Sequence, residues 1–306
     1  MVRTIALLGI LSLPAWSASG PVSEASAPAI IGRIMPGFYN GYLYSCERDH
    51  ITLFAPDGHF VSTLRIEGRG NGRVKVESVA VDSDGTLAIA WLDQPNAGID
   101  IRDSSGNLVR SIDTGRYLPM HLSFSDLSLG DHSLWAFGWQ WDADREWGFA
   151  AKDYQTVKHY SMDGKEIGAY LPRSLFPPGL QPGEEHWQER RITVTSDRVG
   201  IEATSGNLGS HREWIELGLN GDLLGRWKLD LSDTPGSVAF TSDNQVYQPR
   251  WDPEAKSRRV FRLNREKSTW EAVTAPNLHL YGADGDKLVF AAWDGFTMHL
   301  SWYPQP

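Results

Sequence analysis

Apolar and polar residues alternate with a period of two along most of the chain, and turn-forming residues interrupt the alternation at short intervals. Residues 79–91 show this best: one apolar strand leads through Asp-Ser-Asp-Gly into a second. A period of two is typical of β-strands, because successive side chains point to opposite faces of a sheet. No 3.6-residue periodicity of helical length competes with it. The pattern therefore predicts an all-β protein.

Two sequence patterns alternate along the chain. The first, a strand, an acidic turn and a strand, occupies residues 79–91, 122–139, 192–203, 238–251 and 278–293, with a truncated form at 41–46. The second, a strand, a turn that is glycine-containing in most copies and an alternating strand, occupies residues 51–64, 99–112, 157–170, 214–227 and 260–270, with a partial copy at 296–303. Asp-Gly and Asn-Gly between alternating strands favour tight hairpins, because these turns need positive φ angles.

Six such pairs, spaced about 45 residues apart, match the repeat length of propeller blades. The sequence thus predicts a six-bladed β-propeller with four antiparallel strands per blade, formed by a single domain over residues 28–306. Seven blades and an irregular sandwich remain alternatives. The pattern allows a C-terminal strand ending at Tyr303 to pair with an N-terminal strand beginning near Phe38, but it does not determine which blade the two ends share.

The first 27 residues have the features of a signal peptide and leader. Arg3 precedes an apolar run at residues 4–13, which is too short to cross a bilayer. Small residues follow, with candidate cleavage sites after Ser17, Ser19 and Ala27; a buried first strand or helix is the alternative. No later stretch is long and apolar enough for a membrane helix, so no integral membrane segment is expected after signal removal. We predict a secreted or periplasmic protein.

Composition narrows the classes of partner. The net charge of −9 argues against nucleic acid, because phosphate binding needs a basic face. The single cysteine, Cys46, excludes an internal disulfide.

Residues 68–112 resemble an NHL-type propeller repeat. Gly-Arg-Gly-Asn-Gly leads into Glu-Ser-Val-Ala-Val-Asp-Ser-Asp-Gly, followed by Ile-Asp-Ile-Arg-Asp-Ser-Ser-Gly-Asn-Leu. The resemblance implies the six-bladed fold and little about activity, since such repeats occur in binding proteins and enzymes alike. Tryptophan-containing strand ends replace the usual Val-Ala-Asp, which puts a family-wide ligand in doubt.

The predicted long connections all fall on one face of the propeller, at residues 65–78, 139–156, 171–191, 204–213 and 250–259. Long loops on one face of a scaffold commonly carry function.

The second strand of four blades also ends on this face in a tryptophan and an aspartate. The predicted ligand-binding residues are Trp91, Asp93, Trp139, Trp141, Asp142, Trp187, Trp251, Asp252, Trp293 and Asp294. Tryptophan faces beside carboxylates suit sugar rings or peptide groups, whereas packing between blades is the structural alternative.

Nucleophile-elbow, phosphate-loop and zinc-helix motifs are absent from the sequence. The loop at residues 139–148 has acids at alternate positions, but its glycine is one position late for a calcium loop. Glu184-Glu185-His186 could serve acid–base chemistry or hold a metal, although a solvated loop is the simpler interpretation.

The predicted function is therefore an exported module that binds a glycan or protein on its long-loop face, and no cofactor is predicted for it. The alternative is a lactonase-like hydrolase or lyase with a divalent metal such as calcium in the central channel. Its ligands would come from separate blades, and the acids best placed to converge there are Glu47, Asp93, Asp142, Asp252 and Asp294.

Overall fold

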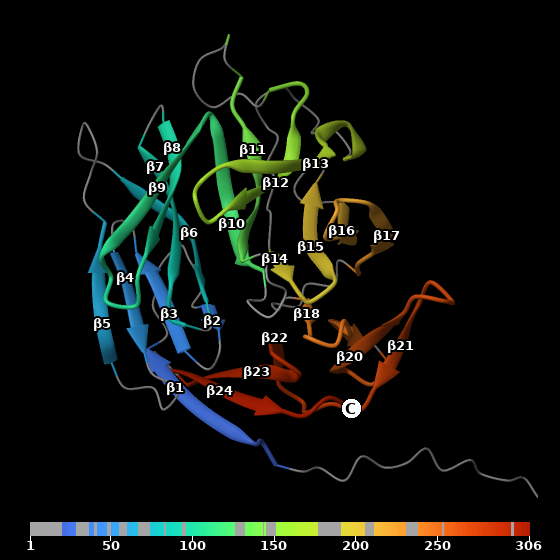
Figure 1. The fold of residues 1–306 in the computed structure, drawn as a ribbon. Coiled ribbons are helices and arrows are strands. Elements are labelled where there is room, and N and C mark those ends of the chain that lie inside the picture. Colours follow the sequence, from blue (N-terminus) through green and yellow to red (C-terminus); the bar gives the residue numbers. More distant parts are fainter. Residues whose placement is uncertain are drawn as a thin grey trace, which may run out of the picture.

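The computed structural model consists of β-strands arranged around a centre (Figure 1). The structure describes residues 20–28, 37–39, 42–47, 50–54, 60–66, 74–82, 84–93, 96–125, 132–142, 144, 151–176, 191–205, 211–230, 238–252, 254–294 and 297–306. The strands of these residues make six four-stranded antiparallel sheets, so the predicted propeller with four antiparallel strands per blade is confirmed.

Each of the first five sheets is built from four consecutive strands. The first contains β2 (Gly37–Tyr39), β3 (Tyr42–Glu47), β4 (His50–Phe54) and β5 (Phe60–Arg65), and the second contains β6 (Lys75–Val81), β7 (Leu87–Asp93), β8 (Asn96–Arg102) and β9 (Leu108–Gly115). The third contains β10 (Tyr117–Phe124), β11 (Ser133–Gln140), β12 (Gln155–Ser161) and β13 (Glu166–Pro172), followed by a short 3-10 helix, η2 (Arg173–Leu175). The fourth contains β14 (Arg191–Val194), β15 (Arg198–Ser205), β16 (His211–Gly218) and β17 (Leu223–Lys228). The fifth contains β18 (Ala239–Phe240), β19 (Val246–Asp252), β20 (Ser257–Asn264) and β21 (Thr269–Val273).

The sixth sheet joins the two ends of the chain. It contains β22 (His279–Asp284), β23 (Lys287–Asp294), β24 (Thr297–Tyr303) and, as its fourth strand, β1 (Ser23–Pro28). β1 pairs with β24 from Ser23 opposite Trp302 to Pro28 opposite Thr297. The strand near Phe38 does not close the ring, because β2 pairs with β3 inside the first sheet. β24 would otherwise be an unpaired edge, and β1 covers it.

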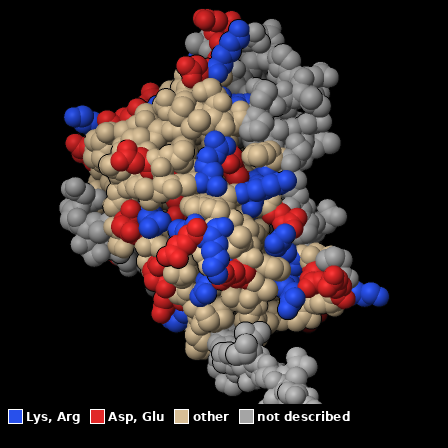
Figure 2. All heavy atoms as spheres, turned by 90° about the vertical axis from the view of Figure 1, so that its right-hand side faces the viewer, with Lys and Arg blue, Asp and Glu red and all other residues tan. Residues whose placement is uncertain are grey.

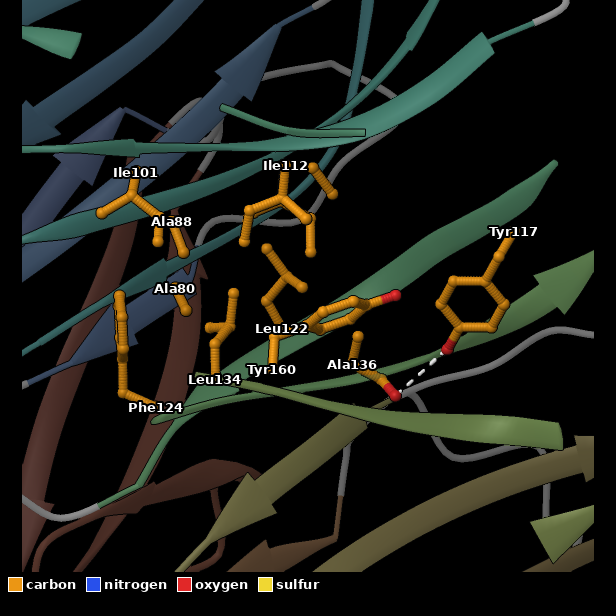
Figure 3. Close-up of a cluster of buried hydrophobic side chains, with 12 residues drawn as sticks. Ala80, Ala88, Ile101, Ile112, Tyr117, Leu122, Phe124, Leu134, Ala136 and Tyr160 are labelled. Carbon is orange, nitrogen blue, oxygen red and sulfur yellow. Dashed lines mark hydrogen bonds between the residues drawn. The ribbon is translucent and has the colours of Figure 1, made fainter. Parts of the chain in front are cut away.

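Apolar side chains pack between neighbouring sheets. In the largest cluster, Ile101 and Ile112 of the second sheet meet Leu122 and Leu134 of the third (Figure 3). The hydroxyl of the buried Tyr117 donates to the carbonyls of Ala136 and Thr156, at 3.1 and 2.9 Å. Each fully buried aliphatic side chain contributes about 1.5–3 kcal/mol. Contacts between neighbouring blades therefore contribute to the core.

Glycines in the turn between the third and fourth strands serve this packing. Gly106, Gly164 and Gly221 have φ angles of +85°, +89° and +87°. A Cβ on Gly221 would overlap the ring of Tyr170, which belongs to the preceding sheet, and one on Gly106 would overlap Leu64 in the same way. Glycine here supplies the left-handed backbone and the space for the neighbouring blade.

The fifth sheet has no glycine in this turn and reaches its neighbour by charge instead. Arg265 donates to Glu216 of the fourth sheet, with Nη2 2.6 Å from Oε1, and to the carbonyl of Asn244. Glu216 is fully buried and also accepts from Arg198 and from the Trp214 indole. The buried carboxylate of Glu216 thus links the fourth and fifth sheets. Removing one of its partners would be strongly unfavourable, because a buried charge would be left unpaired.

Candidate functional site

The second strands of the second, third, fifth and sixth sheets end at one face of the propeller, as the alternating directions of the strands require. Large parts of the long connections predicted for this face lie outside the described residues. Trp187 and the Glu184-Glu185-His186 sequence lie outside them as well, as do residues 145–150 of the acidic loop.

Trp91 is part of the core. It is only 6% exposed and packs with apolar residues of the first and second sheets. Its indole Nε1 donates to Asp100 Oδ1 at 3.0 Å, and Gly98 opposite it leaves room for its ring. Asp93, at the end of the same strand, is also buried. A ligand on the surface cannot stack on the Trp91 ring as this structure holds it.

Trp139 and Trp141 pack against each other, with ring centroids 4.5 Å apart and planes inclined by 45°. Trp141 is buried with Leu92 and Leu118, and Trp139 lies against the same cluster. Asp142 caps the connection that follows, because its Oδ1 accepts from the Asp144 amide at 2.9 Å. These contacts match the structural alternative that the sequence left open.

Trp251 and Trp293 differ from these tryptophans. They end equivalent strands of the fifth and sixth sheets, and they are 46% and 43% exposed. Trp251 lies opposite Arg258 across the β19–β20 pair. Directly opposite residues have their Cβ atoms about 5 Å apart, so these two side chains are neighbours on one face of the sheet.

Arg258 and His279 connect the two exposed tryptophans. Nη1 of Arg258 lies 2.6 Å from Nε2 of His279, which begins the innermost strand of the sixth sheet. The imidazole of His279 meets the Trp293 ring edge to face, with centroids 5.0 Å apart and planes at 87°. We call the four residues Trp251, Arg258, His279 and Trp293 the Trp251–Trp293 surface.

Asp252 supports this surface from the turn beside it. Its Oδ1 accepts from the amides of Glu254 and Ala255 at 3.0 and 3.1 Å, and Oδ2 accepts from Arg259 at 2.9 Å. The Ala255 amide and then the Arg259 guanidinium hold the pKa of Asp252 below its ordinary value. Asp252 therefore has a structural task, whereas Asp294 is exposed at the end of β23.

Of the acids proposed as channel ligands, Asp93, Asp142, Asp252 and Asp294 form no common metal-binding group among the described residues. Over the part of the chain that the structure describes, no group of three or more His, Cys, Asp or Glu side chains is placed to hold a metal ion. The side chain of Glu47 lies outside the described residues. Within the same residues, no helix is long and apolar enough to cross a bilayer.

Sequence reasoning missed Arg258 and His279. A signal for Arg258 existed, since pairing the two strands around the turn at residues 253–256 places it opposite Trp251. His279 had no comparable signal. One of its partners, Arg258, belongs to another blade, and the other, Trp293, lies near the end of the next strand of its own blade.

Comparisons with known proteins give likeness in structure alone. No family model matches the sequence, and no curated protein matches it. The chain is similar to a protein of unknown function from Bacteroides caccae, with 16% identity, 83% of each chain covered and a TM-score of 0.48. It is similar to a virginiamycin B lyase from Staphylococcus aureus, solved with quinupristin, with 12% identity, 86% of this chain and 77% of that chain covered, and a TM-score of 0.49. The WD40 domain of Neurospora crassa Pan2 gives 11% identity, 95% and 91% coverage, and a TM-score of 0.48. Likeness at this level carries no statement about activity.

Proposed function

We propose that this protein is an exported six-bladed propeller that binds a glycan through the Trp251–Trp293 surface. The observation that carries the proposal is the exposure of two tryptophans at equivalent strand ends of adjacent blades. The six four-stranded sheets support the blade count.

The exposure of Trp251 and Trp293 contrasts with the burial of other tryptophans in this chain. Trp135 and Trp214 are 1% exposed and Trp302 is 4% exposed, so this chain buries tryptophan where a core is available. An exposed indole offers a flat apolar face together with one polar N–H group, which suits the alternation of C–H faces and hydroxyl groups on a sugar. Arg258 and His279 add polar groups between the two rings. Separated aromatic rings with polar groups between them favour an oligosaccharide over the continuous apolar centre of a protein interface.

Binding to soluble oligosaccharides, measured by isothermal titration calorimetry, tests the proposal. We expect Trp251→Ala and Trp293→Ala each to weaken a bound oligosaccharide by about tenfold or more, because tryptophans that anchor a ligand cost about 2 kcal/mol when truncated. Phe60→Ala is the matched control, because Phe60 is also an exposed aromatic residue, at 59%. It begins β5, the outer strand of the first sheet, and is not part of the Trp251–Trp293 surface. Unchanged affinity in both tryptophan variants would contradict the proposed site.

Export leads to a prediction about processing. Cleavage after Ser17 or Ser19 leaves β1 intact, whereas cleavage after Ala27 removes all of β1 except Pro28. Because β1 covers the edge of β24, we propose that the leader is cut before Ser23. N-terminal sequencing of the protein recovered from the periplasm or medium of a bacterial host should find a start at residue 18 or 20. A start at Pro28 would refute this.

A further inference from the structure

We propose that the glycan carries a carboxylate and that Arg258 binds it, so that the ligand is an oligosaccharide containing uronic acid residues. This inference rests on the proposed glycan function and adds the chemical class of the ligand.

The arginines around Arg258 already have acidic partners. Nη1 of Arg259 lies 2.9 Å from Asp252 Oδ2, and Nη2 of Arg250 lies 2.5 Å from Asp230 Oδ2. Side chains alternate along β19 and β20, so these pairs occupy one face of the fifth sheet, and Trp251 and Arg258 occupy the other. Figure 2, which shows the side of the molecule with β17 and β21, has basic and acidic side chains interspersed over the surface. Pairing of opposite charges is therefore the rule on this part of the molecule.

Arg258 departs from that rule. No carboxylate of the described residues lies within ion-pair distance of its guanidinium, which forms its hydrogen bond with the imidazole of His279. Nε of Arg258 is buried and has no hydrogen-bond partner among these residues. A guanidinium is permanently charged, and a partly buried charge without a counterion is unfavourable. The position is therefore suited to receive an anion.

The bond to His279 determines the charge of the pair. Arginine only donates hydrogen bonds, so Nε2 of His279 must accept with its lone pair. The imidazole is then neutral and carries its proton on Nδ1. The pair has one positive charge, held in place between Trp251 and Trp293. His279 thus orients the guanidinium without neutralising it.

A sugar carboxylate fits this arrangement better than an isolated inorganic anion. Arginine binds carboxylates through two parallel N–H bonds, and Trp251 next to it offers a flat face for the sugar ring that bears the carboxylate. Trp293, beyond His279, offers a second face for another sugar of the same chain. The chain as a whole has a net charge of −9, so attraction of an acidic glycan must come from this local charge.

The test is calorimetric titration with oligogalacturonate and its fully methyl-esterified form, which has the same sugar backbone without the charges. Alginate and hyaluronan oligosaccharides extend the acidic set, neutral cello- and malto-oligosaccharides the uncharged set, and poly-glutamate represents an acidic peptide. We expect at least one acidic glycan to bind and, for oligogalacturonate, the ester to bind at least tenfold more weakly. Arg258→Gln should weaken the acid by about tenfold or more, because a charge-assisted hydrogen-bond pair is lost. Arg250→Gln is the matched control: it removes an arginine that is paired with Asp230 on the other face of the same sheet, and it should bind as the unaltered protein does.

The outcomes separate the two proposals. Equal binding of charged and uncharged glycans, unaffected by Arg258→Gln but weakened by Trp251→Ala, would overturn the carboxylate inference and keep the glycan function. Binding of poly-glutamate without any glycan, or binding of none of these probes, would overturn both. If Arg258→Gln fails to fold, shown by a lost thermal transition, the comparison of the acidic with the uncharged oligosaccharides on the unaltered protein, including acid against ester where oligogalacturonate binds, still decides the question.

Discussion

Tryptophan has two distinct tasks in this chain, and burial separates them. Trp141 packs with Leu92 and Leu118, whereas Trp251 is nearly half exposed. We expect Trp141→Ala to lower the free energy of unfolding by about 3–5 kcal/mol, because it leaves a cavity in the core. Trp251→Ala should change it by about 0.5 kcal/mol or less. Urea denaturation followed by circular dichroism measures both values, and equal losses would refute the distinction.

The sequence could predict that Trp-Asp endings recur, but not which tryptophans are buried. Burial depends on the face to which the strand register turns each residue and on the space opposite it. The Trp91 ring is accommodated because Gly98 lies opposite, whereas Trp251 has Arg258 opposite. Such facts come from pairing two strands, and the contact between Arg258 and His279 comes from pairing two blades.

Asp252 makes the turn beside the Trp251–Trp293 surface sensitive to acid. Its pKa is lowered in the folded protein, so the stabilisation it provides is complete above the unfolded value near 3.8 and is lost as the pH falls through the lower, folded value. Asp252→Asn should therefore lower the Tm at pH 6, and the difference from the unaltered protein should shrink as the pH falls to 3. Thermal scans at several pH values measure it. A difference that is constant with pH would show that ionisation of Asp252 is irrelevant.

At the scale of the element, the turns between the third and fourth strands need a glycine for two reasons: its positive φ angle and the close approach of the neighbouring blade. Gly221→Ala places a side chain at φ +87° and against Tyr170 of the preceding blade. Gly285→Ala also meets a positive φ, +59°, but nothing lies within 4 Å of its Cβ. We expect Gly285→Ala to cost about 1 kcal/mol and Gly221→Ala clearly more. Chemical denaturation compares them, and equal costs would mean that the inter-blade contact contributes nothing.

Most strands were predictable because their turn residues and alternation are local signals. β1 was not, since Ser-Glu-Ala-Ser-Ala-Pro has no β-branched or aromatic residue and resembles the end of a signal peptide. Its partner β24 lies more than 250 residues away, and β1 is held there by backbone pairing and by the hydrogen bond between Ser26 Oγ and His299 Nδ1 at 2.8 Å. A strand specified by the edge it covers leaves little trace in its own sequence.

At the scale of the whole molecule, the channel-metal alternative differs from the glycan proposal in its response to chelators. A resident metal at a hundredfold excess over its Kd would stabilise the fold by about 2.7 kcal/mol, a shift of a few degrees in Tm. The glycan surface uses no metal ligand, so we expect equal Tm values in calcium and in chelator. A clear drop in chelator would favour the lactonase-like alternative.

The pairing of β1 with β24 means that the two ends of the chain complete a single sheet. Ser23 lies opposite Trp302, so β1 and β24 are already side by side in the orientation of a hairpin. A circular permutant that runs from residue 29 to 306 and continues directly into residues 20–28 should therefore fold to the same propeller. Its sixth sheet would form from sequence neighbours, and we expect it to refold faster, since the longest-range closure is removed. Tryptophan fluorescence during refolding measures the rate.

In the natural order, β1 is synthesised before all the other described strands, and its backbone is paired only after β24, the last of them, has been made. The sixth sheet can therefore be completed only when the chain has been made as far as β24. A polypeptide truncated near its C-terminus would keep an unpaired N-terminal segment, accessible to proteases, while its earlier sheets could already be formed.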